Sequence, residues 1–315
     1  MSFINRIFGA LKKKKVPEQF EEKSTPQQMI TFFDKNGAKI HVTKEEYKAN
    51  VLPGIFERSW SDAQELYNSI IMAFDDELPQ ECLEPAKHLY KIDENHERGA
   101  TILGIALLKN ERYQEAQQHL EKYISAYGKS GVILTNLAKA YSYQGHKIRA
   151  KEVLWESVEL YPNLDNAVQW IASIALDSGG EEGYLSALEE ISKIEGSWYA
   201  DLWLARHDLE KDNKSDALIR YIKILKLAPE NNDALFMISG DLGKHGFVSD
   251  VMNIVYPIYN IKNHGIGPAM NLLQACAETK NVEKGLILLS KLKELKRPDI
   301  IEHIHYYENV FVNNA

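Results

Sequence analysis

The chain has 315 residues, of which 44% are hydrophobic and 26% charged, and its formal net charge is -8. A length above that of one compact core predicts either two globular domains or a repeat array, and the composition excludes wholesale disorder. The negative charge disfavours general nucleic-acid binding, which depends on neutralising phosphates, so we expect no nucleic-acid partner.

The cysteines and the apolar pattern bear on location. Cys82 and Cys276 lie far apart and in no metal-ligand spacing, which suits a reducing compartment better than a disulfide framework. No apolar run is long enough to span a bilayer. The first residues make a poor secretory signal, because Asn5 and Arg6 interrupt the apolar part and the lysines follow it. These features predict a cytoplasmic protein.

The sequence predicts a basic amphipathic N-terminal segment over residues 1–23. On a helix one apolar face would carry Phe3, Ile4, Ile7, Phe8 and Leu11, and Lys12 to Lys15 follow it. Such a segment can lie in a membrane interface with its lysines at anionic headgroups. Weak peripheral membrane contact through residues 1–16 is therefore one interpretation, and an unanchored terminus is the other.

Residues 24–62 predict a small cap. The pattern of 29–42 alternates around Asn36-Gly37, which favours a β-hairpin, and Thr43 with Glu46 fits a capping box that opens a helix. Pro53-Gly54 predicts a joint before the next helices. A lone hairpin is marginally stable, so we expect it to pack as an end cap, with a separate recognition element as the alternative.

The stretch "NLAKAYSYQGHKIRAKEVLWESVELYP" predicts one helical hairpin. Ala138 lies on the inner face of its first helix and Ala150 on that of its second, so the two backbones can approach closely. Gly145 ends the first helix, and Pro162 stops the second.

The same pattern recurs about every 34 residues, an interval typical of stacked helix pairs. We take the repeat residues to be Gly104, Ala116, Ala138, Ala150, Pro162, Ala172, Ala205, Ala217 and Pro229. After an insertion near Gly180 the pattern continues more weakly to residue 298. Residues 63–298 therefore predict about seven hairpins, which begin near 63, 97, 131, 165, 198, 232 and 266. Residues 299–315 predict a C-terminal capping helix.

These residues resemble the tetratricopeptide repeat (TPR), which has small residues at its eighth and twentieth positions and Pro at its thirty-second. The resemblance implies an all-α fold, a right-handed α-solenoid of TPR-like hairpins, here with a small N-terminal β-hairpin and helix cap. The stretches "ERGATILGIALLK" and "SGDLGKHG" also resemble a bacterial group of TPR proteins that has an N-terminal hairpin segment and no settled activity.

The resemblance further implies a groove lined by fixed positions of each first helix. Those positions hold Arg98, Lys109, Asn136, Lys139, Tyr143, Asn166, Gln169, Trp170, Tyr199, Trp203, Arg206, Phe236 and Lys244. This basic and aromatic lining suits an extended or helical segment that carries carboxylates. The alternative is that Trp170 and Trp203 belong to the core between repeats and that the cations only face solvent.

One TPR variant holds a C-terminal carboxylate with Lys and Asn at the fifth and ninth positions of one repeat and Asn at the sixth position of the next. Asn136 matches the sixth position, but the preceding repeat offers Thr101 and Ile105. The sequence therefore gives no support to that clamp.

No catalytic signature is present, and we predict neither enzyme activity, nor a cofactor, nor a metal site. His303 and His305 would point to different faces of a helix. The predicted function is a non-catalytic scaffold that binds a protein or peptide, with an acidic partner as one option. Two alternatives are a membrane-associated assembly factor and a peptide- or metabolite-sensing regulator that uses the glycine-rich segment Gly240 to Gly246.

Overall fold

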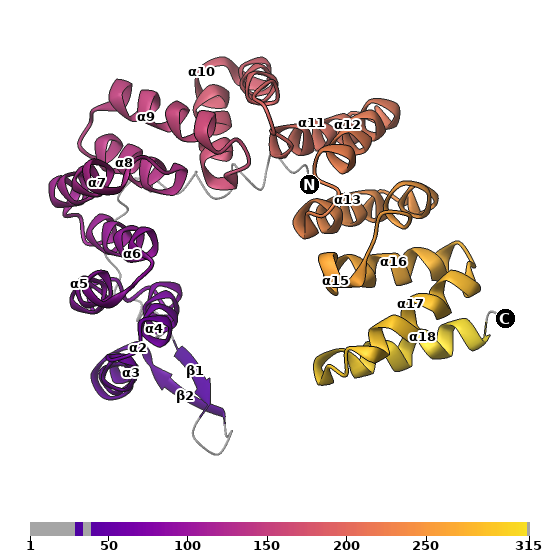
Figure 1. The fold of residues 1–315 in the computed structure, drawn as a ribbon, viewed down its shortest axis with the longest axis horizontal. Coiled ribbons are helices and arrows are strands. Elements are labelled where there is room, and N and C mark those ends of the chain that lie inside the picture. The colour runs from indigo at the N-terminus through magenta and orange to yellow at the C-terminus, as the bar shows by residue number, and fades with distance from the viewer. Residues whose placement is uncertain (1–28, 34–38, 314–315) are drawn as a thin grey trace, which may run out of the picture. The chain divides into compact units, whose positions relative to one another are not determined.

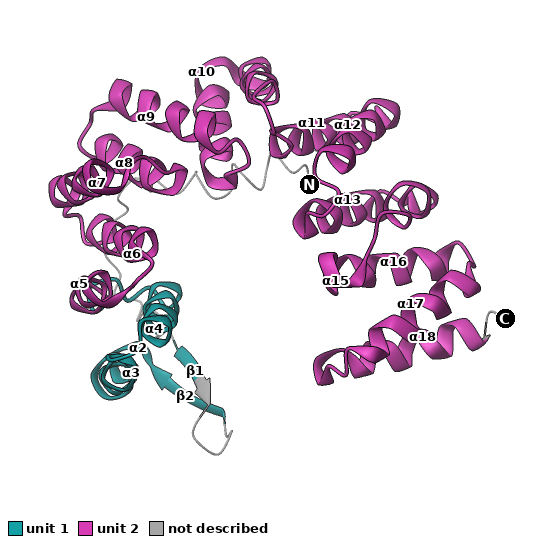
Figure 2. Cartoon of the chain, in the orientation of Figure 1, with its two compact units in different colours: residues 1–81 teal, residues 82–315 magenta. Residues whose placement is uncertain are grey.

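The computed structural model describes residues 29–33 and 39–313, and it divides the chain into two compact units (Figures 1 and 2). Unit 1 is Met1–Glu81 and unit 2 is Cys82–Ala315. Within the described residues, no helix is long and apolar enough to cross a membrane. The amphipathic segment predicted for residues 1–23 lies outside the described part of the chain.

Unit 1 begins with the predicted β-hairpin. Strand β1, Met29–Phe33, pairs antiparallel with β2, Lys39–Thr43, and Met29 lies opposite Thr43. The Asn36-Gly37 turn falls outside the described residues. The capping box is present, because the Glu46 N–H donates to Thr43 Oγ1 (3.2 Å) and the Thr43 N–H donates to Glu46 Oε2 (3.0 Å).

Four helical segments follow in unit 1. They are α2, Lys44–Glu46, the π-helical turn η1, Tyr47–Val51, α3, Leu52–Ser59, and α4, Ala63–Asp75. Our expectation of a joint at Pro53-Gly54 was wrong, because these residues form the first turn of α3, where proline needs no hydrogen-bond partner for its nitrogen. Tyr47, Leu66 and Ile70 are buried in the core of this unit.

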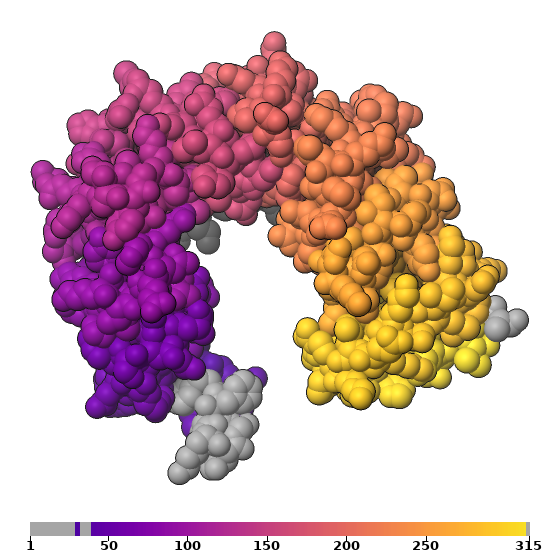
Figure 3. Space-filling view, viewed as in Figure 1, coloured from indigo at the N-terminus to yellow at the C-terminus, as the bar shows by residue number. Residues whose placement is uncertain are grey.

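Unit 2 consists of helices stacked in sequence order. They are α5, Leu83–Ile92; α6, His96–Lys109; α7, Tyr113–Tyr127; α8, Gly131–Tyr143; α9, Lys147–Leu160; α10, Asp165–Ile191; α11, Tyr199–Glu210; α12, Lys214–Leu227; α13, Asn232–Lys244; α14, Val248–Asp250; the π-helical turn η2, Val251–Val255; α15, Ile261–His264; α16, Gly267–Glu278; α17, Val282–Glu294; the 3-10 turn η3, Pro298–Ile300; and α18, Ile301–Asn313. Helices that follow one another in unit 2 contact each other, as α6 and α7, α8 and α9, and α11 and α12 do, and the space-filling view shows the segments in chain order (Figure 3). This confirms the predicted helical hairpins.

The first helix of each hairpin in unit 2 starts close to its predicted position. We call α6, α8, the part of α10 before Gly180, α11, α13 and α16 the first helices. Helix α10 is two helices joined at Gly180, whose φ of 62° breaks the helical conformation at the predicted insertion. The first helices α6 and α8 contact each other, as do α11 and α13, and α13 and α16.

Small residues permit close helix contact inside the hairpins. A Cβ on Gly104 would lie 2.8 Å from Leu120 Cδ2, so glycine is required for α6 to approach α7 this closely. Ala138 and Ala150 are buried between α8 and α9, where Thr135 Oγ1 and Ser157 Oγ hydrogen-bond at 2.8 Å. Of the other predicted repeat residues, the structure buries Ala116, Ala172, Ala205 and Ala217, whereas Pro162 is partly exposed and Pro229 exposed.

The last helix covers the final hairpin. Phe311 of α18 is buried against α17, where a Cβ on Gly285 would overlap the Phe311 ring. Because the ring occupies the space of a side chain at residue 285, α18 closes the apolar surface that a further hairpin would otherwise cover.

Candidate binding face on the first helices

The residues predicted to line a groove lie on α6, α8, α10, α11 and α13, and their exposure differs. Those exposed are Lys109, Tyr143, Asn166, Gln169, Phe236 and Lys244. Those partly exposed are Arg98, Lys139, Trp170 and Arg206, and those buried are Asn136, Tyr199 and Trp203. We call the exposed and partly exposed members the first-helix face.

Arg98 neutralises a buried carboxylate inside the protein. Its Nε lies 2.7 Å from Asp93 Oδ2 and its Nη2 lies 3.0 Å from Asp93 Oδ1, and Asp93 is only 4% exposed. A buried carboxylate needs such a partner, because desolvation disfavours an isolated charge. The main role of Arg98 is therefore to stabilise the connection between α5 and α6.

Arg206 is also held within the protein. Its Nε lies 2.8 Å from Asp241 Oδ2 of α13, and its guanidinium stacks on Trp203 at 4.8 Å from the ring centroid. Tyr221 of α12 donates to the same carboxylate oxygen at 3.2 Å, and burial together with the Asp241 charge raises the pKa of Tyr221. These contacts join α11, α12 and α13.

The aromatic residues near the middle of unit 2 mostly pack between hairpins. Gln169 Nε2 donates to the Tyr199 hydroxyl at 2.9 Å and so links α10 to α11. Trp203 is only 8% exposed, which favours the interpretation that it belongs to the core between repeats. Tyr143, by contrast, is exposed and stacks on Tyr113 at the start of α7.

Lys139 on α8 differs from both arginines. It is partly buried, and among the described residues no carboxylate lies within ion-pair distance of its ammonium. Burial lowers the pKa of Lys139, and the neighbouring charge of Lys109 lowers it further. The first-helix face therefore holds a partly desolvated cation for which the described part of the chain supplies no counter-ion.

Asn136 lies one helical turn before Lys139 and is only 3% exposed. Its Nδ2 donates to the Val132 carbonyl oxygen at 2.9 Å, but its Oδ1 is buried and has no hydrogen-bond partner. On α6, which contacts α8, the Thr101 hydroxyl is also buried without a partner. Unsatisfied buried polar groups are rare in proteins and carry a free-energy cost, so this part of α6 and α8 calls for an explanation.

The backbone repeats at the interval predicted from the sequence. In unit 2, a residue with positive φ stands in the turn between the two helices of each hairpin, at Glu111, Gly145, Gly180, Asp212, Gly246 and Lys280. These turns recur about every 34 residues, and small side chains fill the buried crossings between them. The chain has the tetratricopeptide-repeat fold.

Comparisons with known proteins found solved TPR structures. No family model matches the chain, and no curated protein matches it. A thermophilic TPR protein of Thermus thermophilus is 16% identical, with 57% of this chain and 98% of that one covered and a TM-score of 0.36. YrrB, described as a TPR protein with an unusual peptide-binding site, is 20% identical, with 59% and 97% covered and a TM-score of 0.33. A TPR protein from Parabacteroides merdae is 14% identical, with 79% and 98% covered and a TM-score of 0.33.

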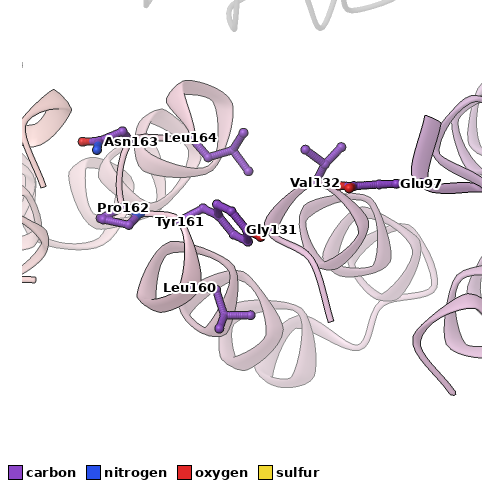
Figure 4. Close-up of a pocket in the computed structure, with 8 residues that line it drawn as sticks. All are labelled: Glu97, Gly131, Val132, Leu160, Tyr161, Pro162, Asn163 and Leu164. Atoms are coloured by element: carbon purple, nitrogen blue, oxygen red, sulfur yellow. The ribbon is translucent and has the colours of Figure 1, made fainter. Parts of the chain in front are cut away.

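A pocket of about 370 Å³ lies at the start of α8, and none of the predicted groove residues lines it (Figure 4). The Tyr161 ring covers Gly131, where an added Cβ would lie 2.7 Å from the ring. Glu97, the acid at its edge, accepts a hydrogen bond from the Ser130 hydroxyl at 2.6 Å. The pocket thus offers apolar walls and an acid that is already engaged.

The glycines of the segment Gly240 to Gly246 lie at the end of α13 and in the turn that follows it. Gly246 has a φ of 74° in the turn after α13, which explains that glycine. A Cβ on Gly243 would meet nothing within 4 Å, and one on Gly240 would lie at ordinary distance from Asn271 Nδ2. Within residues 29–33 and 39–313, no group of three His, Cys, Asp or Glu side chains could hold a metal ion.

Sequence reasoning missed two acids that hold the TPR array together. Asp241 takes up the charge of Arg206, and the buried Asp201 takes up those of Arg220 (3.2 Å) and Lys223 (2.5 Å). The sequence spacing could have indicated the pair of Arg206 and Asp241. An acid that follows a groove-position arginine by about one repeat length lies on the neighbouring first helix.

Proposed function

We propose that the protein is a non-catalytic interaction scaffold whose first-helix face binds an acidic peptide or an acidic segment of a partner protein. The observation that carries the proposal is Lys139, a partly buried ammonium that has no carboxylate partner in the part of the chain that the structure describes. Arg98 and Arg206 on the same face are each paired with an aspartate. A carboxylate from a partner would neutralise Lys139, as Asp93 and Asp241 neutralise the two arginines.

The physical argument concerns desolvation. Burial removes water from the Lys139 ammonium and so favours its neutral form, while Lys109 adds repulsion between like charges. A carboxylate bound here would gain a charge-assisted hydrogen bond at a site whose desolvation is already partly complete. The net charge of -8 gives no long-range attraction for an acidic partner, so recognition must come from this local arrangement.

Exposed groups elsewhere on the face extend the contact. Tyr143 on α8 and Phe236 on α13 offer flat apolar surface, and Asn166 on α10 offers an amide. Aromatic side chains combined with a central polar anchor are typical of peptide-binding surfaces. We further place the protein in the cytoplasm, because Cys82 and Cys276 are both free and buried thiols.

The test is the affinity of acetylated, amidated hexaglutamate for the full chain. Lys139→Met removes the charge and keeps an unbranched apolar side chain, and it should weaken binding by about tenfold or more, the loss expected for one hydrogen bond to a charged group. Lys226→Met is the matched control, because Lys226 is exposed on the second helix α12. Isothermal titration at low salt measures both.

Thermal unfolding of the same variants guards against a folding artefact. Below its folded pKa, Lys139 is charged in both states, and the folded state alone bears the desolvation penalty. Lys139→Met should therefore melt at or above the wild-type temperature. If Lys139→Met is folded and binds hexaglutamate as tightly as the wild type, or if the wild type does not bind it, the proposed function is wrong.

A further inference from the structure

A second pocket, of about 210 Å³, lies between α9 and the two parts of α10 that meet at Gly180. Helices α9 and α10 contact each other and lie next to each other in the stack (Figure 1). The residues that line the pocket stand three or four positions apart within each helix, which places them on one face of that helix. None of the predicted groove residues is among them.

The insertion near Gly180 shapes this pocket. Gly183, one of its lining residues, lies in the part of α10 that follows Gly180. A Cβ on Gly183 would lie 2.6 Å from the Ala175 carbonyl oxygen, so glycine is required for the two parts of α10 to approach this closely. The pocket therefore depends on residues of the insertion, and it is a feature of this chain that the repeat pattern does not supply.

The floor of the pocket is apolar. Ile171 and Ala187 are buried there, and Ile174 and Trp155 are partly exposed. Contact with a ligand would remove this surface from water, which is favourable for apolar groups. The volume sets the size of that ligand, because pockets for drug-sized molecules measure ~300–1,000 Å³. A space of about 210 Å³ suits one small metabolite with an apolar part.

Two opposite charges stand at the rim of the pocket. Lys151 belongs to α9 and Glu190 to α10, and both side chains are exposed. Arg149, also on α9, pairs with Glu152 at 2.9 Å, whereas neither Lys151 nor Glu190 forms an ion pair with any other described residue. Because they do not pair with each other either, a ligand that carries both charges can bridge them.

We infer that this pocket binds a free aliphatic α-amino acid. Lys151 donates a hydrogen bond to the α-carboxylate, and the α-ammonium donates one to Glu190, so that both bonds are charge-assisted. The aliphatic side chain covers Trp155 and Ile174. A ligand with one charge would engage only one side of the rim, and the interior of a peptide offers neither charge. The inference goes beyond the proposed function and is independent of it, since the pocket shares no residue with the first-helix face.

The experiment is isothermal titration of the full chain with L-leucine, L-isoleucine and L-valine. The amino acid that binds most tightly is then compared with its N-acetyl derivative, which lacks the ammonium, and with its amide, which lacks the carboxylate. The wild type should bind the free amino acid about tenfold more tightly than either derivative, because each has lost one hydrogen bond between charged groups.

Two variants assign each charge of the ligand to one side of the rim. Lys151→Met should weaken binding of the amino acid by about tenfold and abolish its advantage over the amide. Glu190→Gln should weaken binding by a similar factor and abolish the advantage over the N-acetyl derivative. Lys147→Met and Glu189→Gln are the matched controls, because both residues are exposed on the same helices and neither lines the pocket. Both controls should bind as the wild type does.

The wild-type titrations alone can overturn the inference, and they require no variant to fold. It is wrong if none of the three amino acids binds, or if both derivatives bind as tightly as the free amino acid. It is also wrong if the two controls lose as much affinity as the pocket variants, since the loss would then come from overall charge. These titrations contain no acidic peptide, so the inference and the proposed function can fail separately.

Discussion

Two cations on the same face of this protein differ in what surrounds them. Arg206 lies 2.8 Å from Asp241 and stacks on Trp203, so a change to glutamate would place two carboxylates together and loosen the contact between α11 and α13. Lys139 has no such partner among the described residues. Substitution of Lys139 therefore probes binding, whereas substitution of Arg206 probes folding.

His119 on α7 provides a test at the level of one residue. Its Nε2 hydrogen-bonds with the Ala100 carbonyl at 3.0 Å and its ring packs edge-on against Tyr90. Burial lowers the pKa of His119, partly offset by that hydrogen bond. The folded state thus holds the imidazole in its neutral form.

The sign of the pH effect follows from that direction. Because the folded pKa is lower than the unfolded one, near 6.5, the unfolded state binds more protons between the two values. The stability that His119 contributes is present above pH 6.5 and is lost as the pH falls through its folded pKa. Urea unfolding between pH 7.5 and pH 5 measures the free energy of unfolding. Its decrease with falling pH should be smaller in His119→Gln, whose side-chain amide can still donate to the Ala100 carbonyl.

His303→Gln is the control for that series, since His303 is exposed on α18. Its pH dependence should follow the wild type. Identical pH slopes for His119→Gln and the wild type would contradict the assignment of His119 as a buried neutral group.

The hairpin turns are the element that repeats most regularly. In unit 2 each places one residue in the left-handed region, which favours glycine, yet Glu111, Asp212 and Lys280 occupy three of these turns. A side chain in this conformation costs about 1 kcal/mol relative to glycine.

Two substitutions should therefore change stability in opposite directions. Lys280→Gly relieves the strain at a φ of 55°, and we expect it to raise the free energy of unfolding by up to about 1 kcal/mol. Gly145→Ala introduces the same strain at a φ of 85°, and we expect it to lower that free energy by a similar amount. Equilibrium denaturation measures both, and changes of the same sign would show that the turns are not constrained as described.

The hairpins themselves were predictable from sequence because close helix crossings require small residues. Ala138 and Ala150 fix one crossing, and Gly104 marks another that Leu120 fills. The turn positions were only partly predictable from sequence. Glycine is typical of such turns and marks them at Gly145 and Gly246, whereas Glu111 and Lys280 are not typical turn residues. The π-helical turn Val251–Val255 was not predictable, because its apolar residues fit an α-helix equally well.

The candidate site was less predictable than the fold. Sequence positions placed Asn136, Lys139 and Arg206 on first helices, but they could not show that Asp241 pairs with Arg206 or that the Asn136 amide nitrogen is taken by Val132. Pairing depends on which side chains of neighbouring helices meet in space. Repeat spacing predicts the helix on which a residue lies, but it does not predict the rotamer of its side chain.

At the scale of the whole molecule, unit 2 is a chain of local contacts in which each hairpin packs mainly on its neighbours. In such arrays the stability of each repeat depends on its own interfaces and those next to it. A cost confined to α8, such as an uncompensated Lys139, is therefore tolerated because the hairpins on either side stabilise it. This arrangement lets one repeat hold a binding site that is unfavourable in the absence of its ligand.

The central claim is that Lys139 is a partly buried cation that awaits a carboxylate, and the pKa of its ε-amino group tests this most directly. Nuclear magnetic resonance of the Lys139 side chain, titrated with and without hexaglutamate, gives both values. We predict a pKa below the usual value of about 10.4 in the free protein and an increase when the peptide binds. An ordinary pKa in the free protein that does not change with peptide would contradict the account.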